Sequence, residues 1–279
     1  MSTRPSSALG VPSRLRLARE TSTTLNEGSL VGRVALVTGG NAGIGFGMAK
    51  ALAEAGADVA IWGTNSERNL KAKSVLEGFV SRQVFTTTCN VAEEDQVDLA
   101  FAATVAALGK VDIVFANAGI RGSLAQPWEI SLEEWRRVQA VNLDGVFLTL
   151  RAGARHLVER GDGGALVVVS STSAIHGSPA TAAYATAKTG VLGLMRSFAV
   201  ALAKHRVRVN ALLPGWTDTE MLAADKQNQR FVDNTISRTP VHRWADPSEY
   251  GPVAVFLADP RNTFHTGDMI VVDGGYTIF

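Results

Sequence analysis

The chain has 279 residues, of which 46% are hydrophobic and 19% charged, and its formal net charge is +1. This length fits one large domain or two small ones, and the near-neutral charge gives no case for nucleic acid or an anionic membrane as a partner. The single cysteine excludes an intrachain disulfide and a cysteine metal cluster, so no metal site is predicted and the cytoplasm is the expected compartment.

The first thirty residues differ in composition from the rest of the chain. They are rich in Ser, Thr and Arg and have no continuous apolar core, which argues against a secretory signal. We predict a flexible N-terminal extension over residues 1–30 and one dinucleotide-binding catalytic domain over residues 31–279. A transit peptide is the alternative, since Glu20 is the first acidic residue. No run of 18 apolar residues occurs, so we expect no membrane span.

A short apolar strand leads into a glycine-rich turn near the start of this domain. Residues 34–37 predict a strand buried on both faces, and Gly39, Gly43 and Gly45 follow before apolar residues recur at helical spacing. Glycine permits positive φ and lets an anion approach the backbone, while a helix start offers unpaired N–H groups to a phosphate. The turn predicts a dinucleotide pyrophosphate site, and a turn without a ligand is the alternative.

Strands and helices alternate along the rest of the chain, which predicts a parallel sheet with helices on both faces. We therefore expect a single-domain, doubly wound α/β fold of the Rossmann type with about seven strands, whose ligands bind beyond the carboxyl ends of the strands. The predicted strands cover residues 34–37, 58–62, 83–88, 111–115, 165–169, 207–213 and 269–272. After the helix that follows the glycine turn, the predicted helices cover residues 67–79, 93–108, 131–158 and 183–204, and a further one opens at residue 246.

Two capping signals mark helix starts. Ser131 with Glu134 predicts a capping box, and Asp246-Pro-Ser-Glu249 predicts the cap of another helix, with Pro247 in its first turn. The segment 217–240 before this second cap is polar and only loosely periodic. We predict that it forms a mobile lid over the substrate.

Tyr184 and Lys188 lie four residues apart on a predicted helix, so they share one face. A nearby cation lowers the pKa of a tyrosine, which is a physical reason to pair the two in proton transfer. Ser171 ends a strand at the edge where this architecture places its chemistry, and it can hydrogen-bond a carbonyl or hydroxyl oxygen. Taken singly, these residues are equally an ordinary helix-surface pair and a turn serine.

Asn142 lies inside the predicted helix 131–158. Asparagine is a poor residue for a helix interior, because its side chain competes for backbone hydrogen bonds. A buried kink with a bound water explains such a residue, and a tolerated polar side chain is the alternative.

These motifs resemble the short-chain dehydrogenase/reductase family. The turn that starts at Thr38 has that family's spacing T-G-x-x-x-G-x-G, and Asn142, Ser171, Tyr184 and Lys188 resemble its Asn-Ser-Tyr-Lys tetrad in order and spacing. The resemblance covers about residues 31–279. It implies that the Tyr is the general acid/base, that the Lys lowers its pKa and holds the nicotinamide ribose, that the Ser orients the substrate oxygen, and that the Asn holds a water in a proton relay.

Further matches extend the resemblance. Asn117-Ala118-Gly119 matches the N-A-G motif behind the adenine ribose, and Pro214-Gly215 begins a loop like the one that fixes the nicotinamide carboxamide. Residues 272–275 resemble a C-terminal signature that is often at a subunit interface. The residues expected to bind the cofactor are Gly39, Asn41, Ala42, Gly43, Ile44, Gly45, Gly63, Thr64, Asn65, Asn90, Val91, Asn117, Ala118, Gly119, Tyr184, Lys188, Pro214, Gly215, Thr217 and Thr219.

The end of the second predicted strand bears on the choice of cofactor. NAD-selective sheets place Asp or Glu there, whereas this chain has Gly63, followed by Thr64 where NADP-type members often have Arg. Asn65, Ser66 and Arg68 can still bind a phosphate. We expect a slight preference for NADP over NAD. Asn90 replaces the family's usual Asp, and its amide oxygen can accept from the adenine amino group.

The resemblance implies an NAD(P)-dependent oxidoreductase that interconverts a secondary alcohol and a ketone, on a sugar dehydrogenase-like or 3-oxoacyl reductase-like substrate. The alternatives are a non-catalytic dinucleotide-binding sensor and a structural subunit on the same fold. Fold does not choose a substrate. A homotetramer or homodimer is expected. The residues expected to contact the substrate are Ser171, Ser173, His176, Tyr184 and Trp216, with Ile120, Arg121 and Met221 as further candidates for the pocket lining.

Overall fold

The computed structural model describes residues 28–279, so most of the predicted N-terminal extension lies outside the described residues. The described chain begins with a turn that is already attached to the domain. Leu30 is fully buried, and its N–H donates a hydrogen bond to the carbonyl oxygen of Ala55 at 3.0 Å. Residue 30 therefore belongs to the folded part, one residue earlier than the predicted start.

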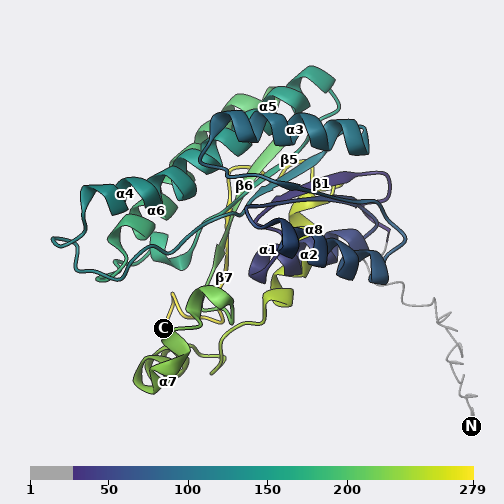
Figure 1. Ribbon diagram of the computed structural model, residues 1–279. Coiled ribbons are helices and arrows are strands. Elements are labelled where there is room, and N and C mark those ends of the chain that lie inside the picture. Colours follow the sequence, from purple (N-terminus) through teal and green to yellow (C-terminus); the bar gives the residue numbers. More distant parts are fainter. Residues whose placement is uncertain (1–27) are drawn as a thin grey trace, which may run out of the picture.

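Seven parallel strands form the sheet, in the order β3-β2-β1-β4-β5-β6-β7 (Figure 1). This order and the parallel pairing confirm the predicted doubly wound α/β fold. The strand ends differ from the predicted ones by no more than two residues. The strands are β1 (Val34–Thr38), β2 (Asp58–Gly63), β3 (Val84–Thr88), β4 (Ile113–Ala116), β5 (Gly164–Val169), β6 (Val207–Pro214) and β7 (Met269–Val272).

Helices cover both faces of the sheet. The first group comprises α1 (Gly43–Glu54), α2 (Ser66–Phe79) and α8 (Gly251–Ala258), and the second comprises α3 (Glu94–Leu108), α5 (Gly145–Arg160) and α6 (Ala182–Leu202), with α4 (Leu132–Gln139) beside α6 (Figure 1). Helix α7 (Gln229–Arg238) lies apart from both groups, near the C-terminus (Figure 1).

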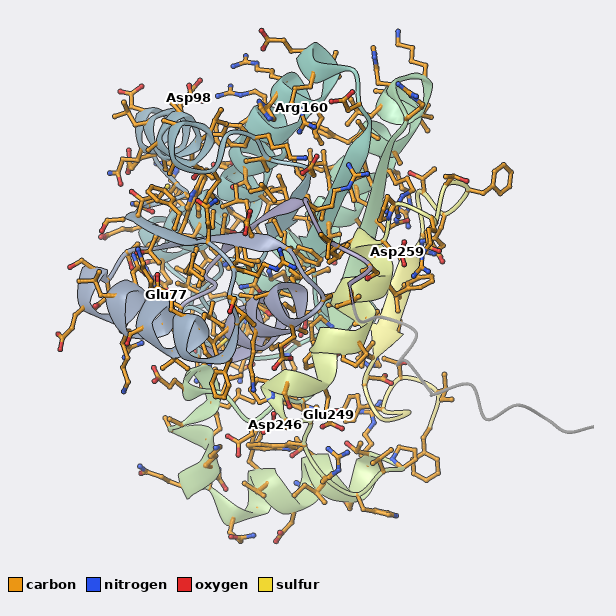
Figure 2. All side chains as sticks on the ribbon, turned by 90° about the vertical axis from the view of Figure 1, so that its right-hand side faces the viewer. Glu77, Asp98, Arg160, Asp246, Glu249 and Asp259 are labelled. Carbon is orange, nitrogen blue, oxygen red and sulfur yellow. The ribbon has the colours of Figure 1, made fainter. Side chains whose placement is uncertain are left out.

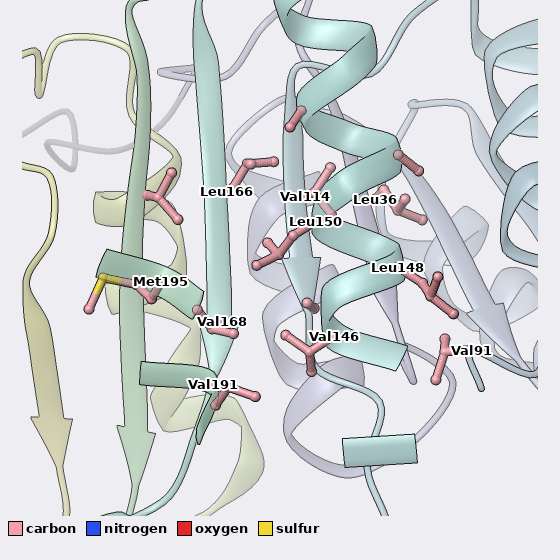
Figure 3. Packing of buried hydrophobic residues seen from close by; sticks show 14 of the residues in the cluster. Leu36, Val91, Val114, Val146, Leu148, Leu150, Leu166, Val168, Val191 and Met195 are labelled. Carbon is pink, nitrogen blue, oxygen red and sulfur yellow. The ribbon is translucent and has the colours of Figure 1, made fainter. Parts of the chain in front are cut away.

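Each face of the sheet packs into its own hydrophobic cluster, because successive strand residues point to opposite faces. Leu36 and Val114 pack beneath α5, together with Leu148 and Leu150 of that helix (Figure 3). Their neighbours Val37 and Phe115 point the other way, into the cluster that contains Met48 of α1. The central strands are thus buried on both faces, as their continuous apolar runs predict.

The single helix predicted over residues 131–158 was wrong. Helix α4 ends at Gln139, a π-helical turn covers Ala140–Asp144, and α5 begins at Gly145. Such π-turns interrupt helices frequently at functional sites. Asn142 lies in this turn and is fully buried, so the expected irregularity at this residue is confirmed.

The two predicted helix caps have different outcomes. Asp246 accepts from Ser248 N–H while Glu249 accepts from Asp246 N–H, so the predicted cap before α8 is a complete capping box. Figure 2 labels these two acidic side chains. Ser131 accepts from Glu134 N–H, but the Glu134 carboxylate instead accepts from Ser123 N–H at 2.6 Å and from an arginine. The capping box predicted at Ser131 is therefore only half formed, because Glu134 ties the preceding loop to α4.

The segment predicted as a lid contains two short 3-10 turns, at Glu220–Leu222 and Asp225–Gln227, followed by α7. Its mobility stays a prediction. Across residues 28–279, no helix has the length and apolar character needed to cross a membrane, and no cluster of three metal-ligating side chains occurs.

Candidate active site

One cavity of about 830 Å³ opens at the carboxyl ends of β1, β2, β3, β4, β5 and β6. This is the edge at which doubly wound sheets bind ligands. Every residue that the sequence predicts as a cofactor ligand lines this cavity. The glycine turn, the ends of five further strands and the first residues of α6 thus form one continuous surface.

The glycine turn has the backbone that a phosphate cradle needs. Gly39 and Gly43 have φ angles of 65° and 52°, which side chains rarely tolerate. A Cβ on Gly45 would overlap the carbonyl oxygen of Gly39. Within the described chain, the N-cap Ala42 makes no side-chain cap, so the first N–H groups of α1 remain available to an anion.

Thr38 ties this turn to the end of β4. Its side chain is buried, and Oγ1 accepts from the N–H groups of Asn117 at 2.9 Å and Ala118 at 3.0 Å. Asn117 Nδ2 donates in return to the Thr38 carbonyl oxygen at 2.9 Å. The Asn117-Ala118-Gly119 motif therefore holds two strand ends in register, a role for Thr38 that the sequence analysis did not foresee.

At the end of β2, asparagine side chains lie where NAD-selective sheets have an Asp or Glu. Asn69 is buried and accepts from Asn41 Nδ2 at 2.7 Å, while its own Nδ2 donates to the Gly63 carbonyl oxygen at 2.9 Å. Arg68 lines the same end of the cavity and pairs with Glu220 at 2.8 Å. A guanidinium is thus present where the sequence predicts a phosphate contact.

Asn90 lies at the cavity edge beyond β3, and its amide oxygen accepts from Ala92 N–H at 3.2 Å. Because an amide oxygen has two lone pairs, it can accept a second hydrogen bond. Its predicted contact with an adenine amino group stays a prediction.

Tyr184, Ser171 and Lys188 meet in the cavity where β5 ends and α6 begins. Ser171 Oγ accepts from Ser173 N–H at 3.1 Å, and the Ser171 side chain lies near enough to the Tyr184 hydroxyl to act on its pKa. Lys188 is buried, its Nζ donates to the Val169 carbonyl oxygen at 2.8 Å, and it lies 5.6 Å from the centre of the Tyr184 ring.

The expected lowering of the Tyr184 pKa was wrong for this structure. Burial raises the pKa of the Tyr184 hydroxyl, and the hydrogen bond with Ser171 opposes this only in part. Burial also lowers the pKa of Lys188 to about 8. The sequence argument considered the neighbouring cation but not the desolvation of both groups, which disfavours the charged form of each.

Ser170, the neighbour of Ser171, has a different role. It is buried, and its hydroxyl donates to the Lys188 carbonyl oxygen at 2.6 Å, which ties β5 to α6. Of these two serines, Ser171 is the one that acts on the pKa of Tyr184.

Asn142 acts behind the cavity rather than in its lining. Its Nδ2 donates to the carbonyl oxygens of Ile120 at 2.8 Å and Val138 at 3.1 Å, and its Oδ1 accepts from Ile120 N–H at 3.0 Å. Asn142 thus fixes the loop after β4. The relay water implied by the resemblance stays a prediction.

The loop after β6 closes the cavity from the other side. Thr217 is buried and hydrogen-bonds the Tyr250 hydroxyl at 2.7 Å, and Thr219 packs over the glycine turn, 3.3 Å from where a Cβ of Gly43 would lie. The predicted carboxamide loop therefore contacts the predicted phosphate cradle.

Four of the five predicted substrate residues line the cavity, namely Ser171, Ser173, Tyr184 and Trp216, and so do Ile120, Arg121 and Met221. His176 does not line it; its ring packs edge-on against Tyr276, 5.6 Å away. The sequence does not show to which side a histidine in a loop points, because packing in the folded chain determines its direction.

Other lining residues were not foreseen. Those from the loop before α6 are Ser178, Pro179, Ala180 and Thr181, and those from the lid segment include Asp225, Asn228 and Phe231. The one sequence feature that points to these lining residues is that they lie close in the chain to Tyr184 or within the predicted lid.

Comparison with known proteins gives consistent results. The family model described as enoyl-(acyl carrier protein) reductase matches residues 39–277. The 3-oxoacyl-(acyl-carrier-protein) reductase FabG of Chlamydia muridarum is 35% identical over 247 residues, which are 88% of this chain and 98% of the relative.

Two solved structures are similar in fold and sequence. A short-chain type dehydrogenase/reductase from Mycobacterium marinum has a TM-score of 0.84 and 35% identity, covering 89% of this chain and 96% of its own. A gluconate 5-dehydrogenase from Burkholderia cenocepacia, in complex with NADP and tartrate, has a TM-score of 0.86 and 33% identity, covering 91% of this chain and 98% of its own.

Proposed function

Because the chain belongs to the short-chain dehydrogenase/reductase family, we propose that it is an NAD(P)-dependent oxidoreductase that interconverts a secondary alcohol and a ketone, with Tyr184 as general acid/base. The observation that carries this proposal is the meeting of Tyr184, Ser171 and Lys188 in the same cavity as the glycine turn. A bound nicotinamide dinucleotide would supply or accept the hydride. The residues of the chain move the proton and hold the substrate oxygen.

The cavity fits such a cofactor along its whole length. The open N–H groups of α1 and the close approach allowed by Gly45 suit a pyrophosphate. Lys188 uses one of its three donors on Val169, so two remain for ribose hydroxyls. At the two ends, the proposed contacts are Asn90, Val91, Asn117, Ala118 and Gly119 for the adenosine, and Pro214, Gly215, Thr217 and Thr219 for the carboxamide.

Tyr184 is suited to donate a proton at neutral pH. Since burial raises its pKa, the phenol is protonated and can give its proton to the ketone oxygen, which Ser171 orients by a hydrogen bond. In the opposite direction the phenolate must accept a proton from the alcohol. Lys188 is charged below pH about 8, so its ammonium favours that phenolate at neutral pH.

We propose NADP as the preferred cofactor, with NAD as the alternative. Gly63 offers no carboxylate to repel a 2′-phosphate, and Arg68 and Asn65 line the cavity beside it. The Burkholderia cenocepacia gluconate 5-dehydrogenase was solved with NADP. The ratio of kcat/KM values for the two cofactors tests this choice, and a tenfold preference for NAD would reverse it.

The substrate is proposed to be a small carbonyl or alcohol compound. The relatives compared above are named for 3-oxoacyl and gluconate substrates, so a 3-oxoacyl reductase-like and a sugar dehydrogenase-like substrate both remain proposals. Ser171, Ser173, Tyr184 and Trp216 are the proposed contacts.

We further propose that residues 31–279 act as one catalytic domain of a cytoplasmic homotetramer or homodimer. The outer faces of α5 and α6 support the assembly, because Phe147 and Val200 are exposed there. Burying such side chains against a second copy is favourable. Light scattering of the purified chain measures the number of subunits.

The decisive experiment is Tyr184→Phe, assayed with a panel of alcohols, sugars and ketones by absorbance of the reduced cofactor. Turnover should fall at least about hundredfold, because a general acid/base contributes about that much, while cofactor binding persists. A sensor or a structural subunit would bind cofactor without turnover in the unmodified chain. Near-normal kcat in Tyr184→Phe would show that another group moves the proton.

A further inference from the structure

Arg121 lines the cavity from the loop that follows β4. It follows Ile120, whose N–H and C=O groups are both held by Asn142. A Cβ placed on nearby Gly119 would lie 3.4 Å from Lys188 Nζ. The loop that carries Arg121 is therefore fixed beside the catalytic groups, and Arg121 lines the same cavity as Ser171 and Tyr184.

The guanidinium of Arg121 is occupied by a carboxylate of the lid segment. Asp225, in a 3-10 turn 104 residues later in the chain, forms an ion pair with Arg121 Nη1. Only 20% of the Arg121 side chain and 13% of the Asp225 side chain are exposed. Arginine carries five N–H donors, and among residues 28–279 this pair is the only side-chain hydrogen bond that Arg121 makes.

The other charges of the cavity are engaged elsewhere. Within the described part of the chain, the charged lining residues are Arg68, Arg121, Lys188, Glu220 and Asp225. Arg68 forms an ion pair with Glu220, and Lys188 donates a hydrogen bond to the Val169 carbonyl oxygen. The cavity lining thus has three cations and two carboxylates, which favours an anionic ligand. Of the three cations, Arg121 lies on the loop that passes beside Lys188.

We propose that Arg121 binds a carboxylate of the substrate and that Asp225 occupies this site until the substrate displaces it. The inference rests on the proposed function and names its substrate class: hydroxy- and oxo-carboxylic acids. Arginine recognises carboxylates through two parallel hydrogen bonds. Leaving a largely buried guanidinium without a counter-charge would be strongly unfavourable. This cost is avoided here, because the carboxylate of the substrate replaces the carboxylate of Asp225.

The wall beside this pair suits the carbon skeleton of such a substrate. Trp216 and Phe231 both line the cavity and pack edge to face, with ring centres 5.1 Å apart. Met221 adds a flexible apolar side chain to the same lining. The carboxylate is thus the group that the cavity recognises by charge, and the rest of the molecule is held by apolar contact.

The test compares matched substrates that differ only in the charged group. The pairs are 4-oxocyclohexanecarboxylate with its carboxamide, and 5-keto-D-gluconate with L-sorbose. The unmodified enzyme should have at least tenfold higher kcat/KM for the carboxylates. Arg121→Gln should reduce this ratio to near one, mainly through KM, whereas Asp225→Asn should keep or raise it, because the internal competitor is removed.

Arg136→Gln is the matched control, since Arg136 is exposed on α4 and carries the same charge outside the cavity. It should leave the ratio unchanged. The inference is overturned if the unmodified enzyme shows no preference for carboxylates, or if Arg121→Gln and Asp225→Asn shift both members of each pair by the same factor. The ion pair would then only hold the lid segment.

A binding measurement separates this inference from the proposed function. Tartrate, which has no ketone that could be reduced, is titrated calorimetrically into the enzyme with saturating reduced cofactor. Weaker binding to Arg121→Gln and tighter binding to Asp225→Asn support the inference even if no ketone in the panel is reduced. Equal affinities in all three proteins overturn it, even if neutral ketones are reduced and the proposed function stands.

Discussion

Asn142 and Ile120 are joined by a reciprocal pair of hydrogen bonds. Asn142 Nδ2 donates to the Ile120 carbonyl oxygen at 2.8 Å, and Asn142 Oδ1 accepts from Ile120 N–H at 3.0 Å. An asparagine side chain matches a peptide group in this way because it carries both a donor and an acceptor. The π-helical turn places Asn142 opposite the loop after β4, and so fixes the loop that carries Arg121.

Asn142→Leu tests this relationship. The replacement has a similar size but leaves the buried polar groups of Ile120 unpaired, so the free energy of unfolding should fall by about 1–3 kcal/mol. Urea unfolding measures this loss. The kcat value should fall as well, because the loop beside Lys188 loses its support. Unchanged stability together with lowered kcat would instead favour a direct role of Asn142, such as the relay water.

Ser171 and Ser170 form a natural pair for comparison. Ser171→Ala removes the hydroxyl beside Tyr184 that is proposed to orient the substrate oxygen, and it should lower kcat by about a hundredfold, which is typical for the loss of one donor to a reacting oxygen. Ser170→Ala removes only the hydrogen bond to the Lys188 carbonyl oxygen. It should lower stability by about 1 kcal/mol and leave most of kcat. The reverse order of effects would mean that the two serines are wrongly assigned.

The lowered pKa of Lys188 predicts how cofactor binding depends on pH. Its pKa is lowered to about 8, so the ammonium that is proposed to hold the ribose is present below this pH and is lost above it. The Kd of the reduced cofactor, followed by fluorescence, should therefore stay level up to pH 8 and then rise by about tenfold per pH unit. Lys188→Met should bind more weakly at all pH values without this break. The same break in both proteins would exclude Lys188 as the titrating group.

We predict that Arg68 influences the preference for NADP over NAD. It pairs with Glu220, and a 2′-phosphate would compete with that carboxylate for the guanidinium. Arg68→Gln should reduce the NADP-over-NAD ratio of kcat/KM by about tenfold, which corresponds to one charge-assisted hydrogen bond. Glu220→Gln should raise the ratio, since the competitor is gone. A ratio that does not respond to either change would place the phosphate elsewhere.

The sequence alone predicted the parts of the site that depend on local backbone requirements. The turn at Gly39 and Gly43 needs positive φ, and β4 and β5 need continuous apolar residues because both faces are covered. Tyr184 and Lys188 share a face through helix geometry alone. For Gly39, Gly43, Tyr184 and Lys188, a few neighbouring positions in the sequence carry the physical constraint, and all four line the same cavity.

Tertiary structure alone decided the charges and the protonation of the site. Arg121 and Asp225 are 104 residues apart, and no local pattern brings them together; the packing of the lid segment does. The pKa of Tyr184 is raised because the folded chain buries it, whereas in the sequence only its cationic neighbour was visible. Burial and long-range ion pairing are properties of the whole packed chain, because solvent exclusion depends on every element that covers a group.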